Sequence, residues 1–160
     1  MKPGDLLSRI QVQNRQRQYR IHRDSVALFC ADLLQSLRHP HAALSVVFAG
    51  PRVMRVLNRQ YRGRDYATDV LSFSYGPIRI GRAPFLGEVI LSPEIAVRQA
   101  LQWRSDPDRE LRMLLMHGIL HLLGYDHETD SGQMKRLQRT LSRRRFFADC
   151  LPLADLKGNR

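Results

Sequence analysis

This chain of 160 residues has few cysteines, few lysines and no long apolar run, and each scarcity excludes a class of protein. Its two cysteines, Cys30 and Cys150, lie far apart in the sequence, which argues against a disulfide framework and favours reduced thiols. No stretch approaches the roughly 18 consecutive apolar residues of a membrane span. The segment Met1–Asp5 lacks the apolar stretch of a signal peptide. We therefore expect a cytoplasmic protein without a membrane segment.

The charge balance is strongly basic. Lys and Arg together number 26 against 15 Asp and Glu, a formal net charge of +11, and the lysines are only Lys2, Lys135 and Lys157. Arginine offers a planar fork that binds phosphate through two hydrogen bonds and stacks on bases. A sequence pI near 10.8 favours a polyanionic partner, most simply nucleic acid. An arginine-rich genome would explain part of the excess, and charge by itself predicts neither fold nor reaction.

Hydrophobic periodicity predicts a single α+β domain covering residues 1–160. With 43% hydrophobic residues the chain can bury a sizeable core. We expect a mixed sheet of about four strands packed with about five helices. We expect Phe146 and Phe147, at the start of the otherwise unassigned tail 146–160, to dock on the core. The expected strands lie near 10–12, 44–48, 70–75 and 86–91, and the expected helices at 24–37, from 51, from 93, at 107–123 and at 132–145.

Three histidines close in sequence are the most informative feature, in the pattern H-x-x-x-H-x-x-G-x-x-H. His117 and His121 lie four residues apart and point from one face of a helix. Gly124 permits a left-handed turn that ends the helix and brings His127 back to the same point. Three converging imidazoles predict a metal site at the end of the 117–123 helix, with a fourth position open to water. The alternative is that these histidines are hydrogen-bonded core residues that bind no metal. A closed structural site would instead need a fourth ligand, for which Asp126 and Cys150 are the candidates.

A residue that metalloproteases require is absent from this pattern. In H-E-x-x-H proteases a glutamate follows the first histidine and acts as general base. Gly118 occupies that position here. The metal-binding spacing of a protease is therefore present without the protease's base, and either the base comes from elsewhere in the chain or the water attacks without one.

Three blocks of this sequence resemble the YbeY endoribonucleases, also called rRNA maturation factors. The blocks are the histidine segment 117–127, the segment Leu57–Phe73 and the strand beginning Leu86-Gly87-Glu88, and the resemblance spans residues 44–141. Ala67 departs from the family, which usually has proline there, and this change leaves the loop less rigid without removing chemistry.

The resemblance implies a zinc-dependent, single-strand-specific endoribonuclease. It implies metal ligands at His117, His121 and His127, one zinc ion per chain, and a functional arginine at Arg62. It further implies action in 16S rRNA 3′-end maturation and ribosome quality control in bacteria. The implied partners are the 16S rRNA precursor and the small ribosomal subunit with its proteins. Nothing in the sequence demands more than a monomer.

Several charged residues have two interpretations. Arg62 pairs with the scissile phosphate or is an exposed helix-end arginine, and the resemblance favours the first role. Arg59 and Arg64 are RNA contacts or solvated charges. Asp126 orients a histidine ligand or caps a turn. Glu88 is an acid or base, or a strand residue paired with an arginine.

Two other functions compete with RNA hydrolysis. One is a ribosome-binding assembly factor whose metal only stabilises the fold, in which case metal removal would unfold the domain. The other is a metalloprotease, against which the missing glutamate and the +11 charge both argue.

Overall fold

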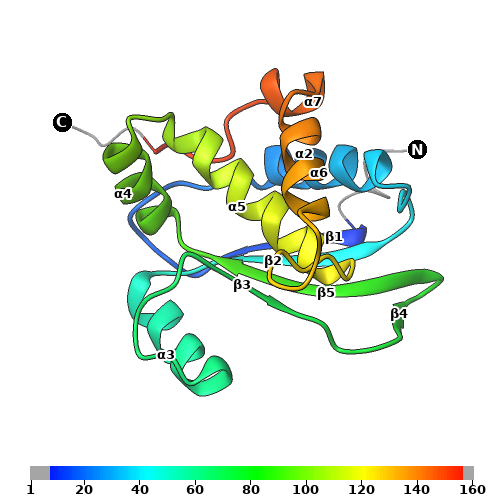
Figure 1. Cartoon of the computed structure of the whole chain (residues 1–160), viewed down its shortest axis with the longest axis horizontal. Helices are drawn as coiled ribbons and strands as arrows, with labels where there is room; N and C mark the ends of the chain where they lie inside the picture. The colour runs from blue at the N-terminus through cyan, green and yellow to red at the C-terminus, as the bar shows by residue number, and fades with distance from the viewer. Residues whose placement is uncertain (1–7, 157–160) are drawn as a thin grey trace.

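The computed structural model of the chain describes residues 8–156, so the ends of the expected domain, 1–7 and 157–160, lie outside the described residues. Within that range five strands and six helices form one α+β unit, as predicted (Figure 1). No helix among the described residues is long and apolar enough to cross a membrane. The elements in chain order are β1 (Ile10–Asn14), α2 (Arg23–Ser36), β2 (Ala43–Phe48), α3 (Pro51–Arg62), β3 (Val70–Phe73), β4 (Ile78–Ile80), β5 (Ala83–Leu91), α4 (Pro93–Trp103), α5 (Pro107–Leu122), α6 (Gln133–Ser142) and α7 (Arg145–Ala148).

The sheet is mixed, with the order β1-β2-β5-β3 and β4 paired to β5. Strands β1, β2 and β5 run parallel, whereas β3 and β4 are antiparallel to β5. Every residue of β2 is buried, because this strand is internal to the sheet and both of its faces are covered. The carboxyl ends of the three parallel strands therefore lie at one edge of the sheet.

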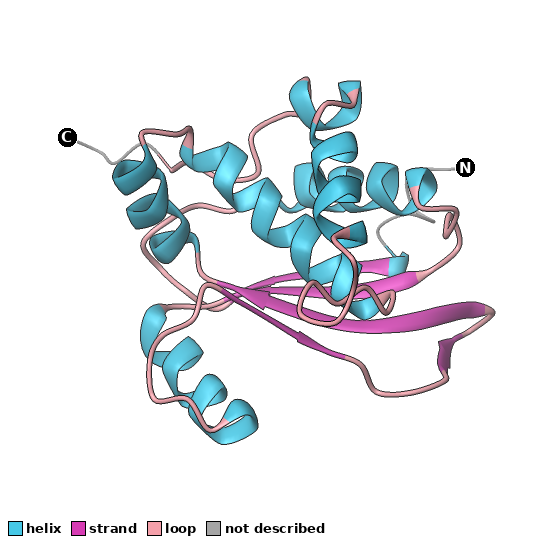
Figure 2. Ribbon diagram, in the orientation of Figure 1, coloured by secondary structure: helices cyan, strands magenta, loops and turns pink. Residues whose placement is uncertain are grey.

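Helices cover the two faces unequally (Figure 2). Helices α2 and α5 lie on one face together with the C-terminal elements, and α3 lies on the other. Alternation along β5 divides the core between these layers: Val89 and Leu91 belong to the large cluster with α2 and α5, and Ile90 belongs to the small cluster with Met54 of α3. The position of a residue along β5 therefore determines the face of the sheet on which its side chain lies.

Helix starts follow the predicted proline signals. Pro51, Pro93 and Pro107 each occupy a first helical position. Two of the preceding caps are side-chain caps: Ser92 accepts a hydrogen bond from the Ile95 amide at 3.4 Å, and Asp106 accepts one from the Arg109 amide at 2.9 Å.

The hairpin strand β4 was not predicted. Its residues Ile78–Ile80 are exposed and pair only with the start of β5. Glycines and prolines flank this short stretch, and such residues are typical of a turn or loop rather than a strand. No burial pattern was there to reveal a strand, because neither isoleucine packs into the core.

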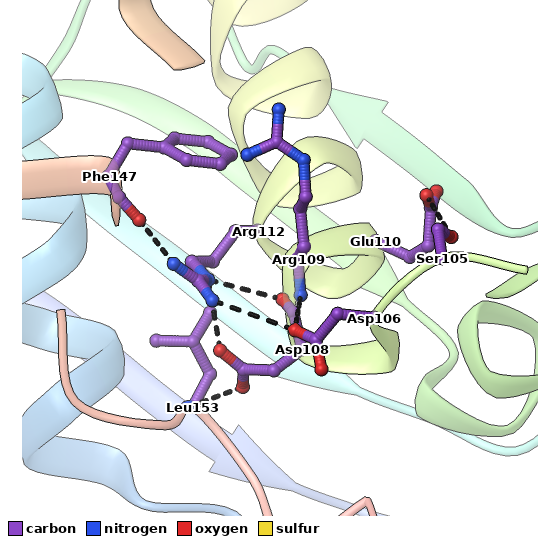
Figure 3. A network of polar contacts seen from close by, with 8 residues as sticks. All are labelled: Ser105, Asp106, Asp108, Arg109, Glu110, Arg112, Phe147 and Leu153. Carbon is purple, nitrogen blue, oxygen red and sulfur yellow. Dashed lines mark hydrogen bonds and ion pairs between the residues drawn. The ribbon is translucent and has the colours of Figure 1, made fainter. Parts of the chain in front are cut away.

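A buried arginine fastens the C-terminal segment to the start of α5 (Figure 3). Arg112 is 9% exposed and its Nε lies 2.9 Å from an Asp108 carboxylate oxygen. Arg112 also donates to the carbonyl of Phe147, and Asp108 accepts from the Leu153 amide at 2.7 Å. Phe147 is fully buried against Phe29, with ring centroids 5.6 Å apart. The predicted docking of the tail's aromatic residues is thereby confirmed.

Candidate metal centre and adjoining cleft

Helix α5 carries two of the three histidines and lies unusually close to the sheet. An added Cβ at Gly118 would stand 2.6 Å from Val89 Cγ1 and 3.1 Å from Ser72 Oγ. Ser72 Oγ donates a hydrogen bond to the Gly118 carbonyl oxygen at 2.8 Å, which ties the helix to β3. The position after His117 is fully enclosed, so it has no room for a glutamate side chain. Packing therefore explains the residue that distinguishes this pattern from the protease pattern.

The turn after α5 returns the chain to the histidines as the glycine spacing predicted. Gly124 has φ +92°, in the left-handed region, and its amide donates to the His121 carbonyl at 3.0 Å. Asp126 then caps the following turn, because its carboxylate accepts from the Glu128 amide at 3.0 Å. These bonds fix the backbone on both sides of His127.

The three imidazoles converge on one point. One ring nitrogen from each of His117, His121 and His127 lies within 4.8 Å of the others. The Nε2 atoms of His117 and His121 are 3.0 Å apart. Ligand nitrogens about 2.0–2.1 Å from a tetrahedral zinc ion are separated by about 3.3 Å, so the His117–His121 pair lies close to the spacing that one such ion needs.

The cluster keeps a ligand position free of protein. Among residues 8–156, no cysteine, aspartate or glutamate joins the three histidines. Cys150 lines a separate cleft with Phe29 and Asp32 of α2. The fourth protein ligand of a closed structural site is therefore missing from the described residues, which leaves a position for water or substrate.

The surroundings of His117 and His121 favour their neutral forms, which are the forms that bind a metal. Burial, and then the neighbouring His121 and His127, lower the pKa of His117 from 6.5 to about 4. Burial and then His127 also lower the pKa of His121. Both rings are consequently unprotonated at neutral pH and present a lone pair.

Gln138 of α6 is a contact that the sequence did not reveal. Its side-chain amide lies 3.1 Å from Nδ1 of His117. If Nε2 held a metal, the proton of the ring would lie on Nδ1, and the Gln138 amide, turned to present its oxygen, would accept that proton's hydrogen bond. The available signal was weak: Gln138 lies one helical turn after the buried Met134, on the inner side of an amphipathic helix.

A cleft of about 590 Å³ lies between the end of α3, β3 and the loop that carries His127. Arg62 and Arg64 line it, together with Glu128, the residue after His127. After burial and His127, the charge of Arg62 also contributes to the lowered pKa of His121, which places the guanidinium within electrostatic reach of the cluster. The other lining residues are Tyr61, Ser72, Phe73 and Ser74.

The loop that holds Arg64 is fixed to α3. Asn58 is buried and its side-chain amide donates to the Tyr66 carbonyl at 2.9 Å. Gly63, with φ +65°, ends the helix directly after Arg62. Arg59 lies one turn earlier on the same helix, exposed and outside the residues that line the cleft.

Glu88 lies on the far side of the sheet from the histidines. Its neighbour Val89 packs under Gly118 of α5, so alternation directs Glu88 to the opposite face. There its carboxylate accepts a hydrogen bond from Ser45 Oγ at 2.9 Å. Asp126, by contrast, adjoins the cluster, and its charge acts on His121.

Comparisons with known proteins agree with this geometry. A family model described as Endoribonuclease YbeY matches residues 11–145. The Endoribonuclease YbeY of an Anaeromyxobacter species is 44% identical over 71% of this chain and 59% of its own length, so the match spans less than two thirds of that relative. The proteins of the same name from Alkaliphilus metalliredigens and Geobacter metallireducens are 36% and 34% identical over 78% and 88% of this chain, and over 87% and 94% of their own lengths.

A solved structure has a similar fold. The solution structure of TM1509 from Thermotoga maritima aligns with a TM-score of 0.57 at 25% sequence identity. The alignment covers 82% of this chain and 85% of that one.

Proposed function

Because the chain belongs to the YbeY family of endoribonucleases, we propose that it hydrolyses single-stranded RNA at the three-histidine site. The proposal extends to one zinc ion per chain, to 16S rRNA 3′-end maturation and ribosome quality control, and to a cytoplasmic monomer acting with the small ribosomal subunit. One observation carries it: three imidazoles meet beside an arginine-lined cleft of about 590 Å³.

His117, His121 and His127 would hold the metal, which when bound supplies Lewis-acid activation of a water nucleophile and of the phosphoryl group. Gln138 would orient His117 through Nδ1. Asp126 holds the turn of His127 and bears negative charge near His121.

Arg62 would bind the scissile phosphate. It closes the cleft from α3, and a guanidinium matches the charge that develops on a phosphoryl group during hydrolysis. Arg64 lines the same cleft and would contact the RNA backbone next to it, as would Arg59, which lies one turn before Arg62 on α3. Tyr61 is 59% exposed at the cleft, with its ring edge-to-face on Phe73, and offers a surface on which a base can stack.

The competing interpretations lack this support. The enclosed Gly118 leaves no room for a protease's glutamate. A metal that only stabilises the fold favours a closed ligand set, and no fourth protein ligand joins the histidines within residues 8–156.

The test is cleavage of a labelled single-stranded RNA that covers a 16S 3′ end. Wild type is compared with His121→Ala and Arg62→Glu, and with the matched surface controls His41→Ala and Arg143→Glu, with metal content measured on each. We expect both site variants to lose cleavage, the histidine variant alone to lose metal, and both controls to cleave normally. Equal cleavage by all five proteins would show that a contaminating nuclease cuts the RNA. It would then favour the assembly-factor function.

A further inference from the structure

A second cleft lies at the carboxyl edge of the parallel strands. Its volume is about 480 Å³, and three segments line it: residues 15–18 after β1, residues 49–53 after β2, and Pro93, Glu94 and Arg98 after β5. Parallel strands bring their following loops to one edge of a sheet, which explains how segments so distant in sequence meet here.

The lining of this second cleft is cationic. Four arginines line the cleft, and its one carboxylate, that of Glu94, forms an ion pair with Arg98. Arg15 is braced by Gln13, whose side-chain oxygen accepts from its Nε and Nη2 at 3.3 and 3.0 Å. Within residues 8–156 the guanidinium groups of Arg17 and Arg52 have no hydrogen bond or ion pair to protein, and both side chains are exposed.

Helix α3 connects the second cleft to the cleft beside the histidines. Pro51, Arg52 and Val53, at its start, line the second cleft, and Arg62, its last residue, lines the first. The helix contains no acidic residue.

The helix also carries a basic stripe between the two clefts. Arg52, Arg55, Arg59 and Arg62 follow one another at intervals of three or four residues and are all exposed, so they lie along one side of the helix. Arg55 is paired with Asp65, to whose carboxylate it donates two hydrogen bonds of 2.9 and 3.0 Å. The other three remain available along about 15 Å of helix.

We propose that the second cleft binds the phosphate backbone of the RNA substrate several nucleotides away from the cleavage site, with the stripe of α3 between the two. The inference rests on the proposed function. Stacked nucleotides rise about 3.4 Å per step, so the three steps of a tetranucleotide span about 10 Å and fall short of the roughly 15 Å of the stripe, whereas the fifteen steps of a 16-nucleotide RNA span about 50 Å. The cleft thus favours longer substrates, and it does so without reading sequence, because phosphate contacts carry none.

The test compares the double variant Arg17→Ser/Arg52→Ser with a control of equal charge, Arg143→Ser/Arg144→Ser, whose exposed arginines follow α6. Binding of a fluorescent 16-nucleotide RNA is measured by anisotropy over a range of salt concentrations. Cleavage kinetics are measured on that RNA and on a tetranucleotide.

We expect the Arg17/Arg52 variant to raise KM for the long RNA on the order of tenfold, and to reduce the slope of log K against log salt by about 1.4, or about 0.7 for each lost phosphate contact. We expect its kcat on the long RNA, and its KM on the tetranucleotide, to match wild type.

Unchanged binding and KM on the long RNA would overturn the second cleft as an RNA site. An equal loss in the Arg143/Arg144 control would also overturn it, because the effect would then come from net charge. Anisotropy detects binding without cleavage: a wild type that fails to cut RNA contradicts the proposed function, whereas a variant-specific loss of binding would still support the second cleft.

Discussion

Replacing Gly118 by alanine tests the close packing that positions the metal centre. Alanine is favoured over glycine in a helix interior by about 1 kcal/mol, so propensity alone predicts stabilisation. The added Cβ would, however, stand 2.6 Å from Val89 Cγ1, 3.2 Å from Val70 Cγ2 and 3.1 Å from Ser72 Oγ. Overpacking of this kind costs about 1–3 kcal/mol, and a strained Ser72 hydrogen bond adds about 1 kcal/mol. We expect a net destabilisation of about 1–3 kcal/mol.

The same change should weaken metal binding, because α5 must move away from the sheet and His117 then shifts relative to Gln138 of α6, which contacts its Nδ1. The measurement combines thermal unfolding of the metal-free protein with zinc affinity. A loss of about 1–3 kcal/mol corresponds to a fall in Tm of roughly 2–4 °C for each kcal/mol.

A double-mutant cycle identifies the cause of the loss. Val89→Ala removes the methyl group that the new Cβ strikes, so Gly118→Ala should cost less in that background, with a coupling energy of about 0.5–3 kcal/mol. If Gly118→Ala instead raises Tm with unchanged zinc affinity, the packing argument is refuted.

Four further predictions concern separate features. Arg112→Ala should destabilise the protein by about 3 kcal/mol in denaturant unfolding, because the Asp108 side chain, which is only 15% exposed, loses its charged partner; a loss below about 1 kcal/mol would contradict this. Gln138→Ala should lower zinc affinity by about 10–100-fold at unchanged Tm of the metal-free protein, as isothermal titration would show, and Gln138→Glu should restore it. Glu88→Gln should keep the wild-type rate of RNA cleavage, since its carboxylate lies on the far face of the sheet; loss of rate with normal metal content would return it to the mechanism. The pKa of His117 is lowered from 6.5 to about 4, so the unfolded chain takes up a proton first and metal-free protein should lose stability as the pH falls from about 6.5 to about 4; His117→Asn should flatten that dependence.

The features predicted correctly from the sequence are those encoded locally. The spacing of His117, His121 and His127 around Gly124 specifies helix, turn and convergence within eleven residues, and the structure brings the three rings together. The starts of three helices were also predicted correctly, because a proline at the first helical position is likewise a local signal.

Features that depend on contacts between distant segments could not be predicted from the sequence. Gln138 reaches His117 from another helix, across twenty-one positions of sequence. The stretch Leu86–Leu91 does not alternate clearly, so it gave no indication of which face Glu88 would occupy. The second arginine-lined cleft draws on three loops that meet only because β1, β2 and β5 are parallel.

The most direct test of the central claim is stepwise reconstitution of chelator-treated protein with zinc while RNA cleavage is followed. We predict no cleavage without metal, a linear rise with added zinc, and a plateau at one equivalent per chain, with His121→Ala gaining neither metal nor activity. Full cleavage by verified metal-free protein, or an active and metal-loaded His121→Ala, would contradict the claim that these three histidines hold a catalytic ion.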